Sequence, residues 1–222
     1  MKKITLLIPL LFSFILYAQK LPKGFVYLKD LVPSIKIELR YFSDDNFIGK
    51  PINGYKSNRL IITKEAASSL KNIQQELLKK ELSLKIFDGY RPQEAVDHFV
   101  EWAKVLNDNL MKTQYYPKVV KSNLFKNGYI AAKSSHSRGS TIDLTIINLK
   151  TSIELDMGSP YDFFGVESHP RYQNISDQQK KNRMLLRKVM LANGFKPYEN
   201  EWWHFTLKKE PFPNTYFKFP VK

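Results

Sequence analysis

Short apolar stretches with a period of two residues predict the strands of this chain. In residues 34–41, apolar side chains alternate with charged ones, which is typical of a half-buried strand. The apolar positions are Ile35, Ile37, Leu39 and Tyr41. Further strands are predicted at residues 82–87, 143–147 and 202–207.

Three longer segments repeat their apolar residues at helical spacing. They are predicted to begin after Thr63, at Pro92 and at Ser176, and the third ends at Asn193 and Gly194. Their apolar stripes are Ala66, Ala67, Leu70, Ile73, Leu77 and Leu78; Ala95, Val96, Phe99, Trp102, Ala103 and Leu106; and Met184, Leu185, Val189 and Ala192. Helices and strands are mixed without regular strand–helix–strand units. The pattern therefore predicts one α+β domain with a central, mainly antiparallel sheet flanked by helices.

The first 18 residues have the pattern of a secretory signal peptide. Lys2 and Lys3 precede an apolar stretch at residues 4–17, and Ala18 is a small residue suited to cleavage. A membrane anchor is the alternative, but this stretch is shorter than the roughly 20 residues of a spanning helix. We therefore expect export to the periplasm or the medium, no stable membrane insertion after cleavage, and one domain over residues 19–222.

Composition narrows the choice of partners. The formal net charge is +14, but the lysines are scattered and no nucleic-acid motif is present, so no nucleic-acid partner is expected. An anionic cell envelope suits an exported basic chain better. The chain has no cysteine, so its stability must come from an apolar core and any bound metal rather than from disulfides.

Two of the four histidines lie among residues that suit a catalytic metal. His136 is followed by Asp143, and Glu201 precedes His204. A catalytic zinc needs three protein ligands and one open position. His136, Asp143 and His204 fit as ligands at the sheet and its loops, with Glu201 as the general base. In a regular strand Glu201 and His204 would point to opposite faces, so the hypothesis requires a loop or bulge there. Taken singly, each residue also fits a surface or core position.

The motifs around these residues resemble those of the VanX-type D-alanyl-D-alanine dipeptidases, part of a zinc peptidase superfamily that also contains D,D-carboxypeptidases. The pattern Ser-x-His-x-x-Gly-x-x-x-Asp spans residues 134–143, and Glu-x-x-His spans residues 201–204. Matching blocks are DGYRP at residues 88–92, MGS at 157–159, YDF at 161–163 and PFPNTYFKFPVK at 211–222. The likeness runs from about Phe25 to the C-terminus.

The resemblance implies a role for each matched residue and a small dipeptide as substrate. His136, Asp143 and His204 would bind one zinc ion, and Glu201 would move the proton. Arg91 would stabilise the oxyanion. Four further residues would face the substrate: Asp162, Ser135 and Tyr41 at its free ammonium group, and Ser134 beside the first ligand. Neither His98 nor His169 is assigned to the metal.

Two features depart from the family pattern. Thr141 stands where the family usually has alanine, which could shift Asp143. The signal peptide is the second departure, because the glycopeptide-resistance members act in the cytoplasm. An exported enzyme would instead act in turnover or scavenging of wall-derived dipeptide. The alternatives are a D,D-carboxypeptidase with the same metal site and an envelope-binding module without activity.

Overall fold

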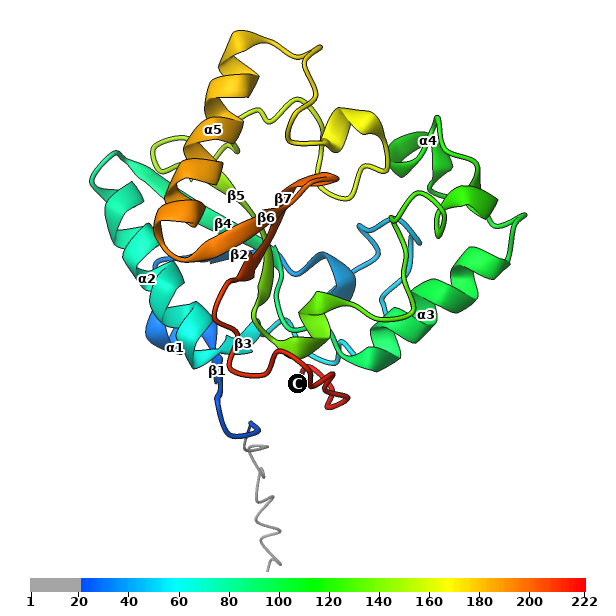
Figure 1. The fold of residues 1–222 in the computed structure, drawn as a ribbon, viewed down its shortest axis with the longest axis horizontal. Helices are drawn as coiled ribbons and strands as arrows, with labels where there is room; N and C mark the ends of the chain where they lie inside the picture. The colour runs from blue at the N-terminus through cyan, green and yellow to red at the C-terminus, as the bar shows by residue number, and fades with distance from the viewer. Residues whose placement is uncertain (1–20) are drawn as a thin grey trace, which may run out of the picture.

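The structure, a computed structural model, describes residues 21–222 (Figure 1). The predicted signal peptide, residues 1–18, lies outside the described residues. Within residues 21–222, no helix combines the length and apolar character needed to cross a bilayer.

A five-stranded sheet forms the centre of the fold, with strand order β2–β4–β5–β7–β6. Its strands are β2 (Lys36–Ile37), β4 (Leu82–Asp88), β5 (Thr141–Asn148), β6 (Phe195–Tyr198) and β7 (Glu201–Leu207). Within this sheet only the β2–β4 pair is parallel, and the other neighbours are antiparallel. A separate antiparallel pair joins β1 (Phe25–Tyr27) to β3 (Ile61–Thr63). The predicted α+β class and the mainly antiparallel sheet are confirmed.

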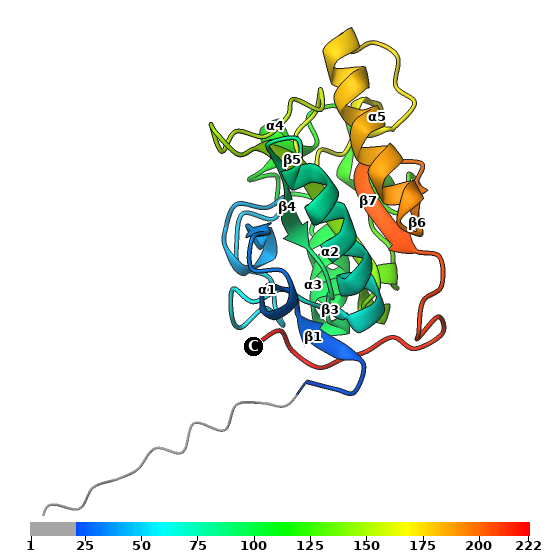
Figure 2. The ribbon, with the colours of Figure 1, turned by 90° about the vertical axis from the view of Figure 1, so that its left-hand side faces the viewer.

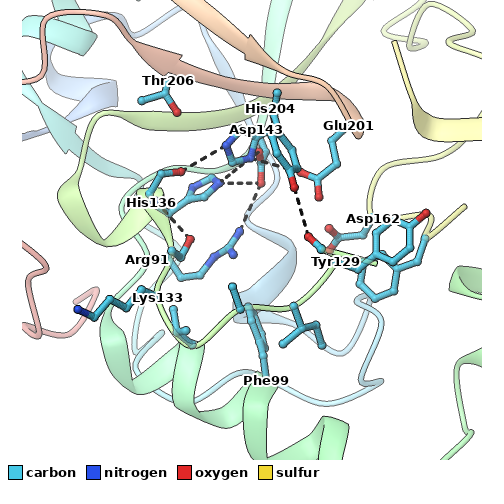
Figure 3. A pocket seen from close by; sticks show the side chains of 18 of the residues that line it. Arg91, Phe99, Tyr129, Lys133, His136, Asp143, Asp162, Glu201, His204 and Thr206 are labelled. Atoms are coloured by element: carbon cyan, nitrogen blue, oxygen red, sulfur yellow. Dashed lines mark hydrogen bonds and ion pairs between the residues drawn. The ribbon is translucent and has the colours of Figure 1, made fainter. Parts of the chain in front are cut away.

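Helices lie on both sides of the sheet. They are α1 (Leu28–Leu31), α2 (Lys64–Leu78), α3 (Gln93–Lys104), α4 (Lys112–Tyr115) and α5 (Asp177–Ala192). Helices α2 and α5 cover one face, while α3 and α4 stand on the opposite side (Figures 1 and 2). The candidate site lies on the side of α3, between this helix and the sheet (Figure 3).

Helix α5 begins as predicted but buries a different face. Ser176 forms a capping box with Gln179, which satisfies free N–H groups of the first turn. Met184, expected inside, is 68% exposed, whereas Arg183 is buried. The helix is rotated because Arg183 donates hydrogen bonds to backbone carbonyls of the loop between β5 and α5. The buried face also contains Leu186, Val189 and Met190, of which only Val189 belonged to the predicted stripe.

The predicted strand at residues 34–41 is shorter in the structure. Only Lys36–Ile37 pairs with the sheet, and Tyr41 lies in a short 3-10 helix, Arg40–Phe42. The side chain of Arg40 binds Glu38 and Asp45, which suits a turn away from the sheet edge. Tyr41 is nevertheless buried, as the alternating pattern predicted.

The C-terminal tail, residues 211–222, wraps the base of the domain without forming a helix or strand (Figures 1 and 2). Its aromatic side chains pack around Phe25, which contacts Phe212, Phe217 and Phe219. The N–H of Phe217 donates to the carbonyl of Ser137 at 2.9 Å, and its own carbonyl accepts from the N–H of Gln93. The tail thus ties together the segments that carry His136 and Arg91.

Candidate active site

Three acidic or imidazole side chains form a row across the sheet. Asp143 on β5 is the register partner of both Asp88 on β4 and His204 on β7. Register partners on neighbouring strands point to the same face of a sheet. Strand pairing alone therefore brings one predicted ligand next to the other, on the face turned toward α3.

His136 reaches this row from a short 3-10 helix, Ser135–Arg138. The hydroxyl of Ser134 accepts from the N–H of His136 at the start of the turn, and Gly139 ends it with a φ of 81°. A Cβ on Gly139 would lie 2.2 Å from a ring atom of Phe25, so only glycine fits there. This local geometry aims His136 at the sheet.

The structure brings the three predicted metal ligands together. The Nε2 atom of His136 lies 3.3 Å from Oδ2 of Asp143 and 3.3 Å from Nδ1 of His204. The distance from Nδ1 of His204 to Oδ1 of Asp143 is 3.2 Å. Ligand atoms placed 2.0–2.1 Å from a common tetrahedral zinc are about 3.3–3.4 Å apart. The two Asp143 distances involve different carboxylate oxygens, and one ligand atom from each of the three residues lies within 4.8 Å of the others, so the three side chains converge closely enough to hold one metal ion.

The hydrogen bonds around both imidazoles favour the same conclusion. Nδ1 of His136 is 2.7 Å from the carbonyl of Gly89, which only a protonated Nδ1 can satisfy, so Nε2 is left as a ligand. Nε2 of His204 lies 3.3 Å from the hydroxyl of Ser135, which leaves Nδ1 to face the ion position. Oδ1 of Asp143 is buried and accepts no hydrogen bond from any residue among 21–222. Ligand atoms of a metal ion are expected to lack such partners.

The charges at this point suit a cation. Burial alone would raise the pKa of Asp143, but His136 and His204 outweigh burial and hold the pKa far below its ordinary value. Burial alone would lower the pKa of His204, but the carboxylates of Asp143 and Glu201 raise it to about 9. The carboxylates of Asp143 and Glu201 thus favour a positive charge at His204, and the same position suits a metal cation.

Glu201 lies beside the ligands rather than among them. Its Oε2 atom is 3.3 Å from Nδ1 of His204. Glu201 is the first residue of β7, directly after the turn from β6, and the register of this pair shifts between Pro197 and Tyr198. The irregularity required by the Glu201–His204 spacing is present, and it gives Glu201 access to the face that carries His204.

Arg91 is held in place by Asp88, a residue to which the sequence assigned no role. Nε of Arg91 donates to Asp88 at 2.9 Å, and its Nη2 lies 3.4 Å from Oδ2 of Asp143. Tyr55 donates to the other Asp88 oxygen, Oδ1, at 2.7 Å, and Nδ1 of His136 is 3.4 Å from Oδ2, the oxygen that Arg91 binds. Asp88 is fully buried at the end of β4. The only sequence signal for Asp88 was its place in the DGYRP block.

Asp162 forms a second polar centre opposite the ligands. Tyr41 donates to its Oδ2 atom at 2.8 Å, and both side chains are buried. The backbone of Asp162 has a φ of 59°, a conformation that non-glycine residues adopt rarely and mostly where the surrounding structure imposes it. Burial, followed by the charge of Asp143, raises the pKa of Asp162 well above its ordinary value. A cation bound beside Asp162 would return it to the ionised form.

All predicted site residues line one cavity of about 350 Å³ (Figure 3). They are Tyr41, Arg91, Ser134, Ser135, His136, Asp143, Asp162, Glu201 and His204. The roles predicted for them stay predictions, but the structure assembles them in one place. The wall also contains Tyr129 and Tyr198, which no sequence signal indicated. Tyr161 was also missed, and its hydroxyl donates to Oδ2 of Asp143 at 3.2 Å.

Thr141 and the two remaining histidines leave the ligand geometry undisturbed. Thr141 pairs with Thr206 across the strands, and their hydroxyls are 2.9 Å apart. The extra hydroxyl is therefore satisfied within the sheet, and Asp143 keeps its register. His98 accepts a hydrogen bond from the N–H of Asn53, and neither it nor His169 belongs to the donor group found in the described part of the chain.

Comparison with known proteins places the chain in a family. The D-Ala-D-Ala dipeptidase family matches residues 22–222. A D-alanyl-D-alanine dipeptidase of Enterococcus faecalis is 44% identical over 198 residues, which are 89% of this chain and 98% of the relative.

The chain belongs to the D-Ala-D-Ala dipeptidase family.

A second relative of this family agrees. The D-alanyl-D-alanine dipeptidase of Streptomyces coelicolor is 41% identical over 89% of this chain and 98% of its own length. A zinc-bound crystal structure of a mutant of the vancomycin resistance D,D-pentapeptidase VanY aligns with 70% of this chain and 77% of its own. That likeness is weak, with a TM-score of 0.41 at 15% identity. The predicted resemblance to the D-Ala-D-Ala dipeptidases, and the expectation of a metallopeptidase, are confirmed at the level of the family.

Proposed function

We propose that this chain is a zinc-dependent dipeptidase that hydrolyses D-alanyl-D-alanine to two molecules of D-alanine. The observation that carries the proposal is the convergence of His136, Asp143 and His204, whose ligand atoms lie within 4.8 Å of one another beside the carboxylate of Glu201. The relatives are D-alanyl-D-alanine dipeptidases, which supplies the substrate class.

One zinc ion per chain would be held by these three side chains. When bound, zinc supplies the Lewis acidity that makes water a nucleophile near neutral pH. Glu201 takes the proton from the attacking water and delivers it to the leaving amine, because its carboxylate lies within reach of the ion position but is not needed as a ligand. The product of the step is two free amino acids.

Arg91 stabilises the negative charge that develops on the oxygen of the scissile carbonyl. Its guanidinium is fixed by Asp88 at 2.9 Å and extends toward the ligands. A donor that is fixed before the reaction stabilises developing negative charge without a cost of reorganisation. Asp88 acts through Arg91 and His136, so it is a positioning residue in this proposal.

Asp162 and Tyr41 would select a substrate with a free amino group. Asp162 is buried and has one hydroxyl partner, and a buried carboxylate strongly favours an ammonium group beside it. Ser135 lies next to His204, on the same wall of the cavity. An N-blocked peptide would bury Asp162 without a cation, which disfavours a carboxypeptidase acting on long wall peptides.

We further propose that the enzyme is exported and acts in turnover or scavenging of dipeptide released from the cell wall. The proposal rests on the sequence of residues 1–18. Cell fractionation with N-terminal sequencing tests it. A chain that begins after Ala18 outside the cytoplasm supports export, and an uncleaved cytoplasmic chain overturns it.

The activity is tested with zinc-reconstituted protein and matched substrates. We expect release of D-alanine from D-Ala-D-Ala, little turnover of N-acetyl-D-Ala-D-Ala, and little turnover of L-Ala-L-Ala. A His98→Ala variant is the control, because His98 lies outside the donor group, and it should keep both zinc and activity. Equal turnover of the N-acetylated substrate would favour a carboxypeptidase, and no turnover of any substrate would favour a binding module.

A further inference from the structure

A second cavity lies beside the hairpin that carries Glu201 and His204. It has a volume of about 270 Å³ and is bounded by α5, the loop at residues 170–175 and the strands β6 and β7. Its apolar wall contains Tyr172, Ile175, Met184, Trp202 and Phe205. The volume is just below the roughly 300–1,000 Å³ of typical ligand pockets, so any occupant must be small.

Arg183 is the buried cation of this cavity. Only 6% of the residue is exposed. Its nitrogens donate to the carbonyls of Met157, Glu167 and His169, and no carboxylate among residues 21–222 makes an ion pair with it. Burial lowers the pKa of Arg183 to about 10, with only partial compensation from Asp156. A guanidinium has five N–H groups, and these hydrogen bonds use three of those of Arg183, which itself lines the cavity.

Further cations at the rim are only partly neutralised. Arg171 and Arg187 share one carboxylate, that of Glu199, at 3.2 and 3.8 Å. Lys180 is 3.7 Å from Asp177, which is highly exposed. The cavity therefore joins an aromatic floor to an excess of positive charge. A neutral apolar molecule would contact only the aromatic floor. A small inorganic anion would interact only with the positive charge.

We infer that this cavity binds a small organic monoanion, a carboxylate attached to an aromatic or branched aliphatic group. The carboxylate lies against Arg183 and Arg187, and the apolar body rests on Trp202 and Phe205. Guanidinium groups bind carboxylates through paired hydrogen bonds, which gives the contact direction as well as charge. Burying the apolar body adds about 25 cal/mol for each Å² removed from water.

Two contacts link the second cavity to the first. Pro197, at the register shift beside Glu201, lines both cavities. Arg183 holds carbonyls on both sides of Asp162, at Met157 and at Glu167. A bound carboxylate therefore contacts the strand pair that carries the general base and the arginine that fixes the Asp162 loop. Binding itself requires no turnover, so it is tested separately from the proposed dipeptidase activity.

The test is calorimetric titration of the zinc-loaded full chain with 3-phenylpropionate. We expect the acid to bind at least about tenfold more tightly than its neutral amide, 3-phenylpropanamide. Only the acid carries a negative charge that can form an ion pair with the arginines. Met184→Glu places a carboxylate at the rim and should weaken binding of the acid at least about tenfold. Met184→Gln is the matched neutral control: it loses the same apolar contact as Met184→Glu but adds no charge, so it should weaken binding of the acid much less than Met184→Glu does. Both changes are at a residue that is 68% exposed, so the fold should be retained.

A His136→Ala variant excludes binding of the probe at the metal. The acid should still bind this variant, because the second cavity does not contain His136. Equal affinity of the acid and the amide, equal affinity of the two Met184 variants, or loss of binding in His136→Ala would each overturn the inference. No measurable binding of the acid to the parent would overturn it as well.

Discussion

The two halves of the candidate site are held by different kinds of structure. Asp143 and His204 are register partners within the sheet, so strand pairing fixes their separation. His136 and Asp162 lie on irregular segments, which side chains and the C-terminal tail hold in place. The sheet half should therefore tolerate small changes around it, whereas the loop half should depend on contacts far away in the sequence.

The largest expected effect comes from Glu201, which belongs to the sheet half. Glu201→Ala should keep one zinc per chain and lower turnover of D-Ala-D-Ala by about 10²–10⁴-fold, because the general base is lost while the three ligands remain. Steady-state kinetics and metal analysis check both parts. Glu199→Ala is the matched control in the neighbouring turn and should stay near parental activity. Undiminished turnover in Glu201→Ala would remove this residue from the mechanism.

The next largest effect concerns Asp162 in the loop half. Asp162→Asn keeps the hydrogen bond from Tyr41 but removes the charge that faces the substrate ammonium. We expect kcat/KM for D-Ala-D-Ala to fall by about 30-fold, which corresponds to about 2 kcal/mol for an unpaired buried charge. The low rate on N-acetyl-D-Ala-D-Ala should change little. A parallel loss on both substrates would show that Asp162 does not recognise the amino group.

A smaller effect is expected from the ion pair that joins the His136 loop to Glu210, the residue just before the tail. Arg138 donates two hydrogen bonds to Glu210, at 2.7 and 2.8 Å. Glu210→Gln should weaken zinc binding about tenfold, because contacts behind a ligand typically contribute 10–100-fold to metal affinity. Competition with a chelator measures the zinc affinity of each variant. Glu154→Gln breaks an ion pair with Lys85 at the other end of the sheet and should leave zinc affinity unchanged. Equal affinities in the two variants would contradict this role of the Arg138–Glu210 ion pair.

The smallest effect is predicted for Thr141, in the sheet half. Thr141→Ala leaves the buried hydroxyl of Thr206 without its partner, which should lower the free energy of unfolding by about 1–2 kcal/mol. Turnover should stay within about twofold, since the β5–β7 register does not depend on this contact. Thermal unfolding and kinetics measure the two quantities. A large loss of activity with little loss of stability would mean that Thr141 positions Asp143.

The sequence predicted the chemistry of the site better than the contacts that support it. His136, Asp143, Glu201 and His204 stand in spaced motifs, and such motifs are visible in the order of residues alone. The short Glu201–His204 spacing even required the irregularity found at the start of β7. The strands at residues 82–87 and 202–207 were predicted because their apolar patterns are dictated by a buried sheet.

The contacts that position the site residues could not be predicted, because they join segments that are distant in the sequence. Asp88 orients Arg91 and lies beside His136, yet nothing in its immediate neighbours shows this. The predicted buried face of α5 was right at Val189 but wrong at Met184, because Arg183 turns inward to bind loop carbonyls and hydrophobic periodicity gives no signal for such contacts. Likewise, Phe217 acts through its backbone N–H and carbonyl, which every residue other than proline has.

The position of the tail has a consequence for the order in which the enzyme can mature. A ribosome releases the chain from its N-terminus onward, and domains form as their residues emerge. The buried Val221 and the Phe217 contact with Ser137 involve residues that are made about 80 positions or more after Ser137. The contacts that hold the His136 loop therefore cannot form until residues 217–221 have left the ribosome, well after the loop itself has emerged.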